Sequence, residues 1–286
     1  MNDTKAACDV LLRAMARARL LRGRTILIKL GGSAMEDPIA TRGTLESVVA
    51  LQSMGIRLIL VHGGGKPIDR AMAAGGLVPK KVAGRRYTDD ATLEIVVRTL
   101  CEEINPSIVA TIRELGGRAD GITASRTFPI RGETLTLDGV DLGHVGQPTR
   151  VETANLQDLI ADGRIPVLPS LAVREDGNWL NVNADTIASA VAGALRATSA
   201  IFLTDTPGVL QDRNDPDSLL ACLSAAECRD LIRRGIIAGG MIPKVEACLD
   251  ALREGAGRAV ILDGRNPYSL LNDFVSGSPC GTEIVP

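Results

Sequence analysis

The sequence predicts an α/β fold class: a three-layer αβα sandwich with a continuous, mainly parallel central sheet. Two observations lead to this prediction. Apolar runs with the length and composition of β-strands alternate with helical segments along most of the chain, which favours a parallel sheet covered by helices on both faces. Polar or glycine-rich turns directly follow several of these runs, and ligands of such sheets bind beyond the carboxyl ends of the strands.

Length and composition indicate a globular protein. The chain has 286 residues, of which 45% are hydrophobic, so it can bury a large core. A net charge of −2 and an aromatic content of 2% give no basis for nucleic-acid binding. Because no stretch reaches the ~18 apolar residues of a membrane span, we expect no membrane partner.

Cysteine and histidine usage points to a reducing compartment. The six cysteines are scattered without a C-x-x-C pair, and the chain has only two histidines, so a zinc site is not expected. The N-terminus lacks the charged-then-apolar pattern of a secretory signal. We therefore expect a cytoplasmic protein.

The N-terminal part predicts a helix followed by strand–turn–helix units. Residues 5–22 carry apolar side chains at three- and four-residue spacing, which predicts a helix that either caps its own domain or packs on a neighbouring subunit. Strand 25–30 precedes a helix near 41–54. Strand 57–61 precedes a helix that starts at Pro67, since proline suits a first helical turn.

The rest of the chain continues the alternation after a less regular stretch. Residues 80–88 predict a hairpin, a helix capped near Asp89 runs to about 102, and another helix ends near 115. Residues 118–151 hold short β pieces that we interpret as a flap. The remaining expected elements are a strand at 165–168, two β pieces within 171–182, a helix at 184–195, a strand at 200–204, helices near 224–234 and 241–253, a strand at 258–262 and a short terminal helix.

Two glycine clusters are the most informative local feature. Gly31 and Gly32 follow the first strand, and the segment His62-Gly63-Gly64-Gly65-Lys66 follows the second. Such turns present backbone N–H groups to anions. Lys29 stands inside an apolar run, where an unpaired ammonium is costly, so it is expected to point toward the turn. A surface lysine is the alternative.

The second cluster does not match three familiar motifs. Pro67 follows the lysine, so the segment is no Walker A loop, and the chain contains neither a G-x-S-x-G elbow nor a G-x-G-x-x-G fingerprint after a strand. A glycine nest for a phosphoryl group remains. We interpret His62 as a packed structural residue rather than a base.

Three further positions have both a functional and a structural interpretation. Arg86, beside Arg85, suits a carboxylate clamp, although paired arginines are commonly just solvated. Asp185 begins a helix, where it either caps the helix or orients lysines. Lys244 follows two glycines at another helix start and is unremarkable on its own.

Six ordered motifs together resemble the amino acid kinase family, and within it the acetylglutamate kinase branch. The likeness covers about residues 25–284. The motifs are Ile28-Lys29-Leu30-Gly31-Gly32, Val61-His62-Gly63-Gly64-Gly65, Gly84-Arg85-Arg86-Tyr87-Thr88-Asp89, Asp141-Leu142-Gly143-His144-Val145-Gly146, Asn181-Val182-Asn183-Ala184-Asp185 and Gly239-Gly240-Met241-Ile242-Pro243-Lys244.

The resemblance implies ATP-dependent phosphorylation of the side-chain carboxylate of N-acetyl-L-glutamate to N-acetyl-L-glutamyl 5-phosphate, in arginine biosynthesis. Lys29 and Lys244 would flank the transferred phosphoryl group, and Asp185 would hold both lysines in place. Backbone N–H groups of Gly32 and Gly64 would complete the catalytic cradle.

Substrate and nucleotide residues follow from the same resemblance. Arg86 and Asn181 would bind acetylglutamate beside the backbone of Gly64 and Gly65. Mg²⁺ would be carried on the ATP phosphates, with no metal site in the protein itself. The implied nucleotide-binding residues are Lys29, Gly31, Gly32, Asp205, Thr206, Pro207, Gly208, Val209, Leu210, Ile236, Ile237, Ala238 and Lys244.

The implied organisation is a helical extension (1–24), a lobe for substrate binding and dimerisation (25–195) and a nucleotide-binding lobe (196–286). A homodimer is expected, with a hexamer through the N-terminal helix as the alternative and a PII-type protein as a candidate regulator. Arginine-inhibited relatives usually carry a tyrosine on that helix and a histidine near the position of Val260. Both are missing here, which leaves arginine inhibition and a hexamer open. Tyr87 replaces a common valine beside the substrate arginine.

Two other functions remain open from the sequence. One is a kinase of a longer analogue such as carrier-linked α-aminoadipate, because one methylene changes binding by only ~1–3 kcal/mol. The other is a catalytically inactive amino-acid sensor on the same fold. The joint presence of Lys29, Asp185 and Lys244 favours an enzyme.

Overall fold

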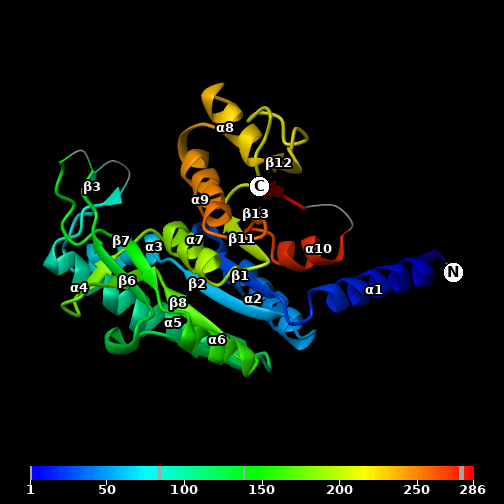
Figure 1. Ribbon diagram of the computed structural model, residues 1–286, viewed down its shortest axis with the longest axis horizontal. Coiled ribbons are helices and arrows are strands. Elements are labelled where there is room, and N and C mark those ends of the chain that lie inside the picture. Colours follow the sequence, from blue (N-terminus) through cyan, green and yellow to red (C-terminus); the bar gives the residue numbers. More distant parts are fainter. Residues whose placement is uncertain (1, 83–84, 138, 277–279) are drawn as a thin grey trace.

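A computed structural model describes residues 2–82, 85–137, 139–276 and 280–286 of the chain. Within these ranges the central sheet has eight strands in the order β12-β14-β13-β11-β1-β2-β8-β5. Every neighbouring pair is parallel except β13–β14. Helices cover both faces of this sheet (Figure 1). The prediction of an αβα sandwich with a continuous, mainly parallel sheet is therefore confirmed.

The central sheet draws strands from almost the whole chain. In chain order they are β1 (Thr25–Leu30), β2 (Arg57–His62), β5 (Ala119–Gly121), β8 (Ile165–Pro169), β11 (Ser199–Thr204), β12 (Cys222–Ser224), β13 (Ala259–Asp263) and β14 (Thr282–Val285). The α-helices are α1 (Asn2–Leu21), α2 (Pro38–Ser53), α3 (Gly65–Ala74), α4 (Asp90–Arg98), α5 (Asn105–Glu114), α6 (Ala154–Ala161), α7 (Ala184–Ala194), α8 (Ala225–Arg233), α9 (Ile242–Arg253) and α10 (Ser269–Val275).

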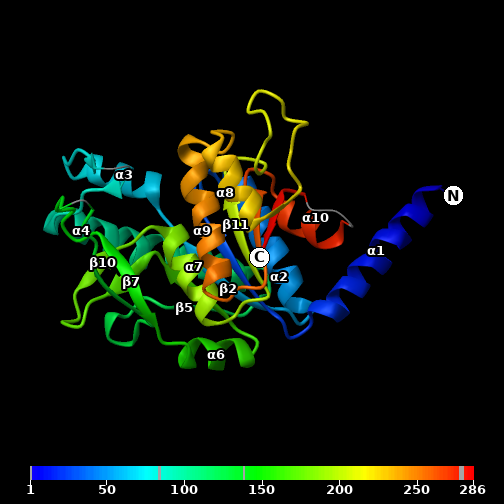
Figure 2. The same ribbon diagram turned by 45° about the horizontal axis from the view of Figure 1, so that its top comes forward.

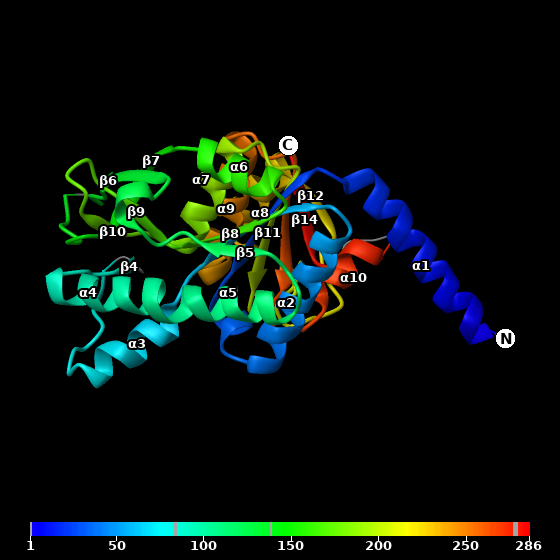
Figure 3. The same cartoon turned by 90° about the horizontal axis from the view of Figure 1, so that it is seen from below.

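The alternation of side chains along β1 separates two cores. Leu27 packs with residues of α6, α7 and α9, whereas Ile26 and Ile28 pack with residues of α2, α5 and α10. Figure 3 shows these two helical layers on opposite sides of the sheet. Because Lys29 is two residues after Leu27, its side chain lies on the same face of the sheet, which α7 covers. The face on which Lys29 lies therefore decides which helix can supply its partner.

A smaller sheet and a hairpin lie beside the central sheet near its carboxyl edge. The smaller sheet has the order β10-β9-β6-β7, and β3 pairs with β4 in the hairpin. This arrangement confirms the hairpin expected at 80–88 and the β pieces expected within 118–151 and 171–182. Gly84, part of one motif, lies outside the described residues. The bounds are β3 (Lys81–Val82), β4 (Arg85–Arg86), β6 (Ile130–Thr134), β7 (Gly146–Val151), β9 (Leu171–Val173) and β10 (Trp179–Asn181), with short 3-10 turns η1 (Gly32–Met35), η3 (Ser125–Thr127) and η4 (Gly239–Met241).

Several elements differ from the expectation: strand β12 was not predicted, and α3 begins at Gly65 rather than at Pro67. Helix α2 begins at Pro38 rather than near 41, because the Asp37 side chain caps the Ile39 N–H and proline occupies the first turn. Helix α6 was not predicted, since its eight residues show only a short apolar pair, Leu156 and Ile160. Strand β14 follows the expected terminal helix, and its four residues gave too short a pattern to detect.

Helix α1 projects from the body of the protein, as Figures 1 and 2 show. Ala14 is buried against the core that includes α10, whereas several large apolar side chains on the helix are exposed. Leu12 is 63% exposed and Leu20 is 72% exposed. The predicted helix is confirmed. The protomer buries only part of its apolar surface and leaves the rest exposed.

A π-helical segment, η2 (Thr99–Ile104), joins α4 to α5 in one continuous helix. The Asn105 N–H bonds to the carbonyl of Leu100, five residues earlier. Pro106, which has no N–H, follows directly, so the regular ladder cannot continue there. The sequence indicated two helices, the first of them ending near 102. In the structure they form one continuous helix, and the predicted break falls within this widened turn.

The π segment supports the end of β2. Asn105 Nδ2 lies 3.1 Å from His62 Nε2 and donates to the carbonyl of Val167 at 2.9 Å. His62 Nδ1 lies 3.1 Å from the Gly63 carbonyl. Since a carbonyl only accepts and the amide nitrogen only donates, the imidazole is neutral, with its proton on Nδ1. Complete burial lowers the pKa of His62 to about 4. The interpretation of His62 as a packed structural residue agrees with this geometry.

His62 should make stability depend on pH. Its folded-state pKa lies below the ordinary value of 6.5, so the unfolded state takes up a proton first as the pH falls. We expect the free energy of unfolding to drop by about 2 kcal/mol from pH 7.5 to pH 5 through this group alone. Denaturant unfolding of wild type and a His62→Gln variant, which has no titratable group there, measures the difference. Equal pH dependence in the two proteins would contradict the assignment.

Candidate active site

Lys29 is held at the end of β1 by a partner on α7. The residue is 8% exposed, and its Nζ lies 2.7 Å from Asp185 Oδ1. The side chain lies along Gly31, where a Cβ would be 2.0 Å from Nζ and 2.7 Å from Cε. Glycine is therefore required at position 31 for this lysine to lie against the turn.

The two glycine turns lie side by side beyond the strands. Gly32 has φ +47°, a conformation that favours glycine, and space around its Cβ position is open. Gly64 is the N-cap of α3, and a Cβ there would lie 2.7 Å from Leu100 and 2.8 Å from Ile104 of the π segment. The π segment therefore packs directly against the N-terminus of α3, where backbone N–H groups have no partner within the helix.

Asp185 contacts one of the two lysines that it was expected to hold. Asn183 caps α7 by accepting from the Asp185 N–H, which places the carboxylate in the first helical turn. From there it pairs with Lys29. Lys244, near the start of α9, pairs with Asp205 at the end of β11 instead. The expectation of a shared partner is met for Lys29 alone, because Asp205 offers Lys244 a carboxylate on the adjoining strand.

Both glycine turns line one cavity of about 450 Å³. It lies among the carboxyl ends of β1, β2 and β8, the N-termini of α3 and α7, and the hairpin. Its walls contain all the residues expected for acetylglutamate together with Lys29. The lining residues are Lys29, Gly31, Gly32, Glu36, Gly63, Gly64, Gly65, Lys66, Ile68, Asp69, Lys81, Arg85, Arg86, Val145, Ser170, Asn181, Val182, Asn183, Ala184 and Asp205.

Arg86 and Asn181 reach this cavity from different elements. The Arg86 side chain is 11% exposed, and its Nη2 donates to the carbonyl of Gly65 at 3.2 Å. Asn181 Nδ2 donates to Thr88 Oγ1 at 3.0 Å. Tyr87, between the arginine and the threonine, is not among the lining residues, so its bulk faces elsewhere.

A second cavity of about 340 Å³ adjoins the first at Asp205. Lys244 lines it, and the Lys244 ammonium lowers the pKa of Asp205 below its ordinary value. The sequence reasoning placed the residues 205–210 and 236–238 in one nucleotide pocket, and the structure brings all of them together here. The full lining is Asp205, Thr206, Pro207, Gly208, Val209, Leu210, Arg213, Ile236, Ile237, Ala238, Gly240, Met241 and Lys244.

Several lining residues were not anticipated from the sequence. Asp69 lies 2.5 Å from Arg86 Nη1, and Lys66 forms an ion pair with Glu36 across the two turns. Asp69 follows Gly65 by four residues, so helical spacing could have placed it on the face beside the turn. Nothing in the sequence indicated Glu36, because its contact depends on how the η1 turn folds back.

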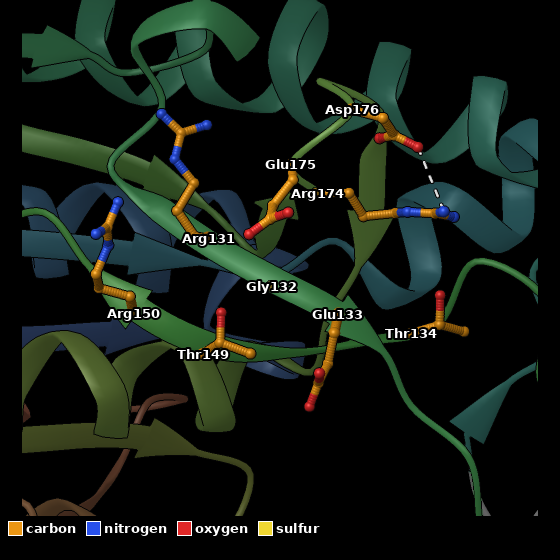
Figure 4. A pocket seen from close by; sticks show the side chains of 9 residues that line it. All are labelled: Arg131, Gly132, Glu133, Thr134, Thr149, Arg150, Arg174, Glu175 and Asp176. Atoms are coloured by element: carbon orange, nitrogen blue, oxygen red, sulfur yellow. Dashed lines mark ion pairs between the residues drawn. The ribbon is translucent and has the colours of Figure 1, made fainter.

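Another hollow, of about 1120 Å³, lies on the smaller sheet. Figure 4 shows charged side chains from β6, β7 and the turn after β9 around it. Arg174 pairs with Asp176 at 3.3 Å, and Arg131 and Arg150 both pair with Glu152. Its three arginines thus have carboxylate partners, and this hollow contains none of the expected site residues.

The described residues offer neither a metal-binding cluster nor a membrane-spanning helix. Within the described ranges, His, Cys, Asp and Glu side chains form no group of three or more that could hold a metal ion. The same part of the chain has no helix that is both long and apolar enough to cross a membrane.

Comparison with known sequences identifies relatives over nearly the whole chain. Residues 24–263 match the amino acid kinase family. The chain is 40% identical to the acetylglutamate kinase of Trichodesmium erythraeum (strain IMS101) over 276 residues, which cover 96% of this chain and 94% of that protein. It is also 40% identical to the acetylglutamate kinase of Methanocella arvoryzae over 284 residues, with the same two coverages.

Solved structures show the same fold. N-acetylglutamate synthase from Neisseria gonorrhoeae, complexed with coenzyme A and N-acetyl-glutamate, superposes with a TM-score of 0.85 at 25% identity. The alignment covers 97% of this chain but only 63% of the synthase. Carbamate kinase from Giardia lamblia bound to AMP-PNP superposes with a TM-score of 0.64 at 16% identity over 92% of this chain and 98% of that one. The chain therefore belongs to the amino acid kinase family and, within it, to the acetylglutamate kinases.

Proposed function

We propose that this protein transfers the γ-phosphoryl group of ATP to the side-chain carboxylate of N-acetyl-L-glutamate, in arginine biosynthesis. The observation that carries the proposal is the pair of adjoining cavities that meet at Asp205. One contains both glycine turns and the Lys29–Asp185 ion pair. The other contains the residues expected to bind the nucleotide, except Lys29, Gly31 and Gly32, which line the first cavity.

The residues of the site suit phosphoryl transfer to an acid. The acceptor is already an anion at neutral pH, so the reaction needs no general base. The main barrier is repulsion between the carboxylate and the phosphates, and positive groups at the junction reduce it. Lys29 would neutralise charge from the first cavity. Lys244 would do so from the second, after exchanging its carboxylate partner Asp205 for phosphate.

Backbone donors would stabilise the charge that develops on the transferred group. The N–H groups of Gly32 and Gly64 border the first cavity, and removal of one such donor typically costs ~10²–10³ in turnover. ATP would bring Mg²⁺ on its phosphates, and the metal would add further positive charge there. We assign no protein ligand to it.

Arg86 and Asn181, which also line the first cavity, would orient the acid substrate. Arg86 would bind the carboxylate that does not react, because a guanidinium matches a carboxylate in shape and charge. Asn181, held by Thr88, would fix the remaining polar groups beside the backbone of Gly64 and Gly65.

The two cavities suggest a division of labour along the chain. We propose a substrate-binding and dimerising lobe at 25–195 and a nucleotide-binding lobe at 196–286, with 1–24 as an extension. We further propose that the protein is cytoplasmic and forms homodimers, which the N-terminal helix joins into a larger assembly. A PII-type protein remains a candidate regulator, proposed from the family alone.

Loss of the Lys29 ammonium should strongly reduce the rate of phosphoryl transfer. Wild type should form an acyl phosphate from acetylglutamate, ATP and Mg²⁺, which hydroxylamine converts to a coloured hydroxamate. We expect Lys29→Ala to lower kcat by about 10³-fold, because a positive charge next to the transferred group is lost. Lys5→Ala, which removes an exposed lysine of α1, should retain wild-type activity. No hydroxamate with wild type, or full activity in Lys29→Ala, would disprove the mechanism.

The enzyme should prefer acetylglutamate to its longer analogue. One extra methylene must fit a cavity of fixed size, so we expect kcat/KM for N-acetyl-α-aminoadipate to be about 10- to 100-fold lower. The same hydroxamate assay with both substrates measures the ratio. A preference for the longer substrate would favour the aminoadipate alternative instead.

The exposed apolar surface of α1 should join dimers. We expect residues 23–286 alone to form a dimer, and the full chain to form a larger assembly, by size-exclusion chromatography with light scattering. Leu12→Glu should have the same effect as the deletion, since this side chain is 63% exposed and contributes little to the protomer. An unchanged mass in both variants would refute the role of α1 in assembly.

A further inference from the structure

Helix α3 holds the Arg86 guanidinium from one side. Nη1 of Arg86 lies 2.5 Å from Asp69 Oδ1 and 3.2 Å from Met72 Sδ, and Nη2 donates to the Gly65 carbonyl at 3.2 Å. Gly65, Asp69 and Met72 follow one another at spacings of four and three, so they lie on one face of the helix. One helical face therefore supplies all three contacts.

The element that carries Arg86 provides little support of its own. Strands β3 and β4 have two residues each and pair through two positions. An arginine side chain on such a hairpin has many rotamers to choose from. The contacts with α3 select one of them. Among the described residues, Nε of Arg86 has no protein acceptor, so this N–H remains available to a ligand in the cavity.

Asp69 has two opposing effects on an anionic substrate. Its carboxylate offsets part of the charge of Arg86 and would repel a second carboxylate nearby. However, the Asp69 side chain is 40% exposed, so water weakens that repulsion. Lys81 and Arg85 also line the cavity, and neither forms an ion pair within the described part of the chain. Five basic side chains line the cavity against three acidic ones, so the cavity stays positive with Asp69 in place.

We infer that Asp69 is a positioning residue that holds Arg86 ready for the non-reacting carboxylate of the substrate. This inference rests on the proposed function. Asp69 does not line the second cavity, in which we place the nucleotide. Its removal should therefore weaken binding of the acid substrate while leaving the chemical step intact.

Steady-state kinetics with acetylglutamate, combined with calorimetric titration of the same compound, tests the inference. We expect Asp69→Ala to raise both KM and Kd for acetylglutamate about tenfold, the scale of one misplaced charge-assisted hydrogen bond. The kcat and the KM for ATP should stay within about twofold of wild type. Asp69→Asn keeps an acceptor oxygen and should lie closer to wild type. Arg70→Ala, an exposed neighbour on the same helix, is the matched control and should behave as wild type.

A second comparison asks whether Asp69 acts through Arg86. In an Arg86→Lys background, Asp69→Ala should change the Kd by less than about twofold, because the fork that Asp69 orients is already gone. An unchanged or lowered KM and Kd in Asp69→Ala would overturn the inference and leave the proposed function intact. If wild type itself neither binds nor phosphorylates acetylglutamate, the proposed function fails, and the inference fails with it.

Discussion

The ion pair between Lys29 and Asp185 is the interaction on which the rest of the site depends. Lys29 belongs to a strand whose neighbouring residues are buried and apolar. An unpaired ammonium in that position would carry a large desolvation cost, and the nearby carboxylate compensates for it. Because the pair joins the end of β1 to the first turn of α7, it also fixes how these two elements meet. The ammonium that we propose as catalytic is thus kept in place by the contact that joins β1 to α7.

The elements around this pair pack so closely that larger side chains would crowd their neighbours at three glycine positions. Gly31 allows the lysine to lie on the turn, and Gly63 approaches α7 so closely that a Cβ would lie 3.3 Å from Ala184. Gly64 is backed by the π segment. Glycine therefore has a different role in each turn. In the first turn it leaves space for the Lys29 side chain, and in the second it lets two helical segments pack closely against the backbone.

Much of the fold could be predicted from sequence, and the reasons for the omissions are physical. The strand around Lys29, the glycine turns and the residues at 205–210 were recognisable because each depends on local pattern or on a family motif. The Lys244–Asp205 pairing was not, because two residues from separate elements meet only after the sheet forms. The position of Asp69 beside the second turn was within reach of helical spacing, but its pairing with Arg86 of the hairpin was not. Helix α6 and strand β14 are too short for a periodic signal, and their stability comes from tertiary packing.

The π segment has a further consequence for how this helix can vary. Asn105 lies directly after the widened turn and contacts His62. The π turn takes up one residue more than an α-turn, so α4 and α5 face the sheet as they would if that residue were absent. Deleting one residue from η2 would therefore restore a regular α-helix and leave both flanking helices in phase. Deleting one residue from α5 would instead rotate everything after it by about 100° about the axis. A change of length in this helix is thus compatible with the sheet at η2 and incompatible with it further along.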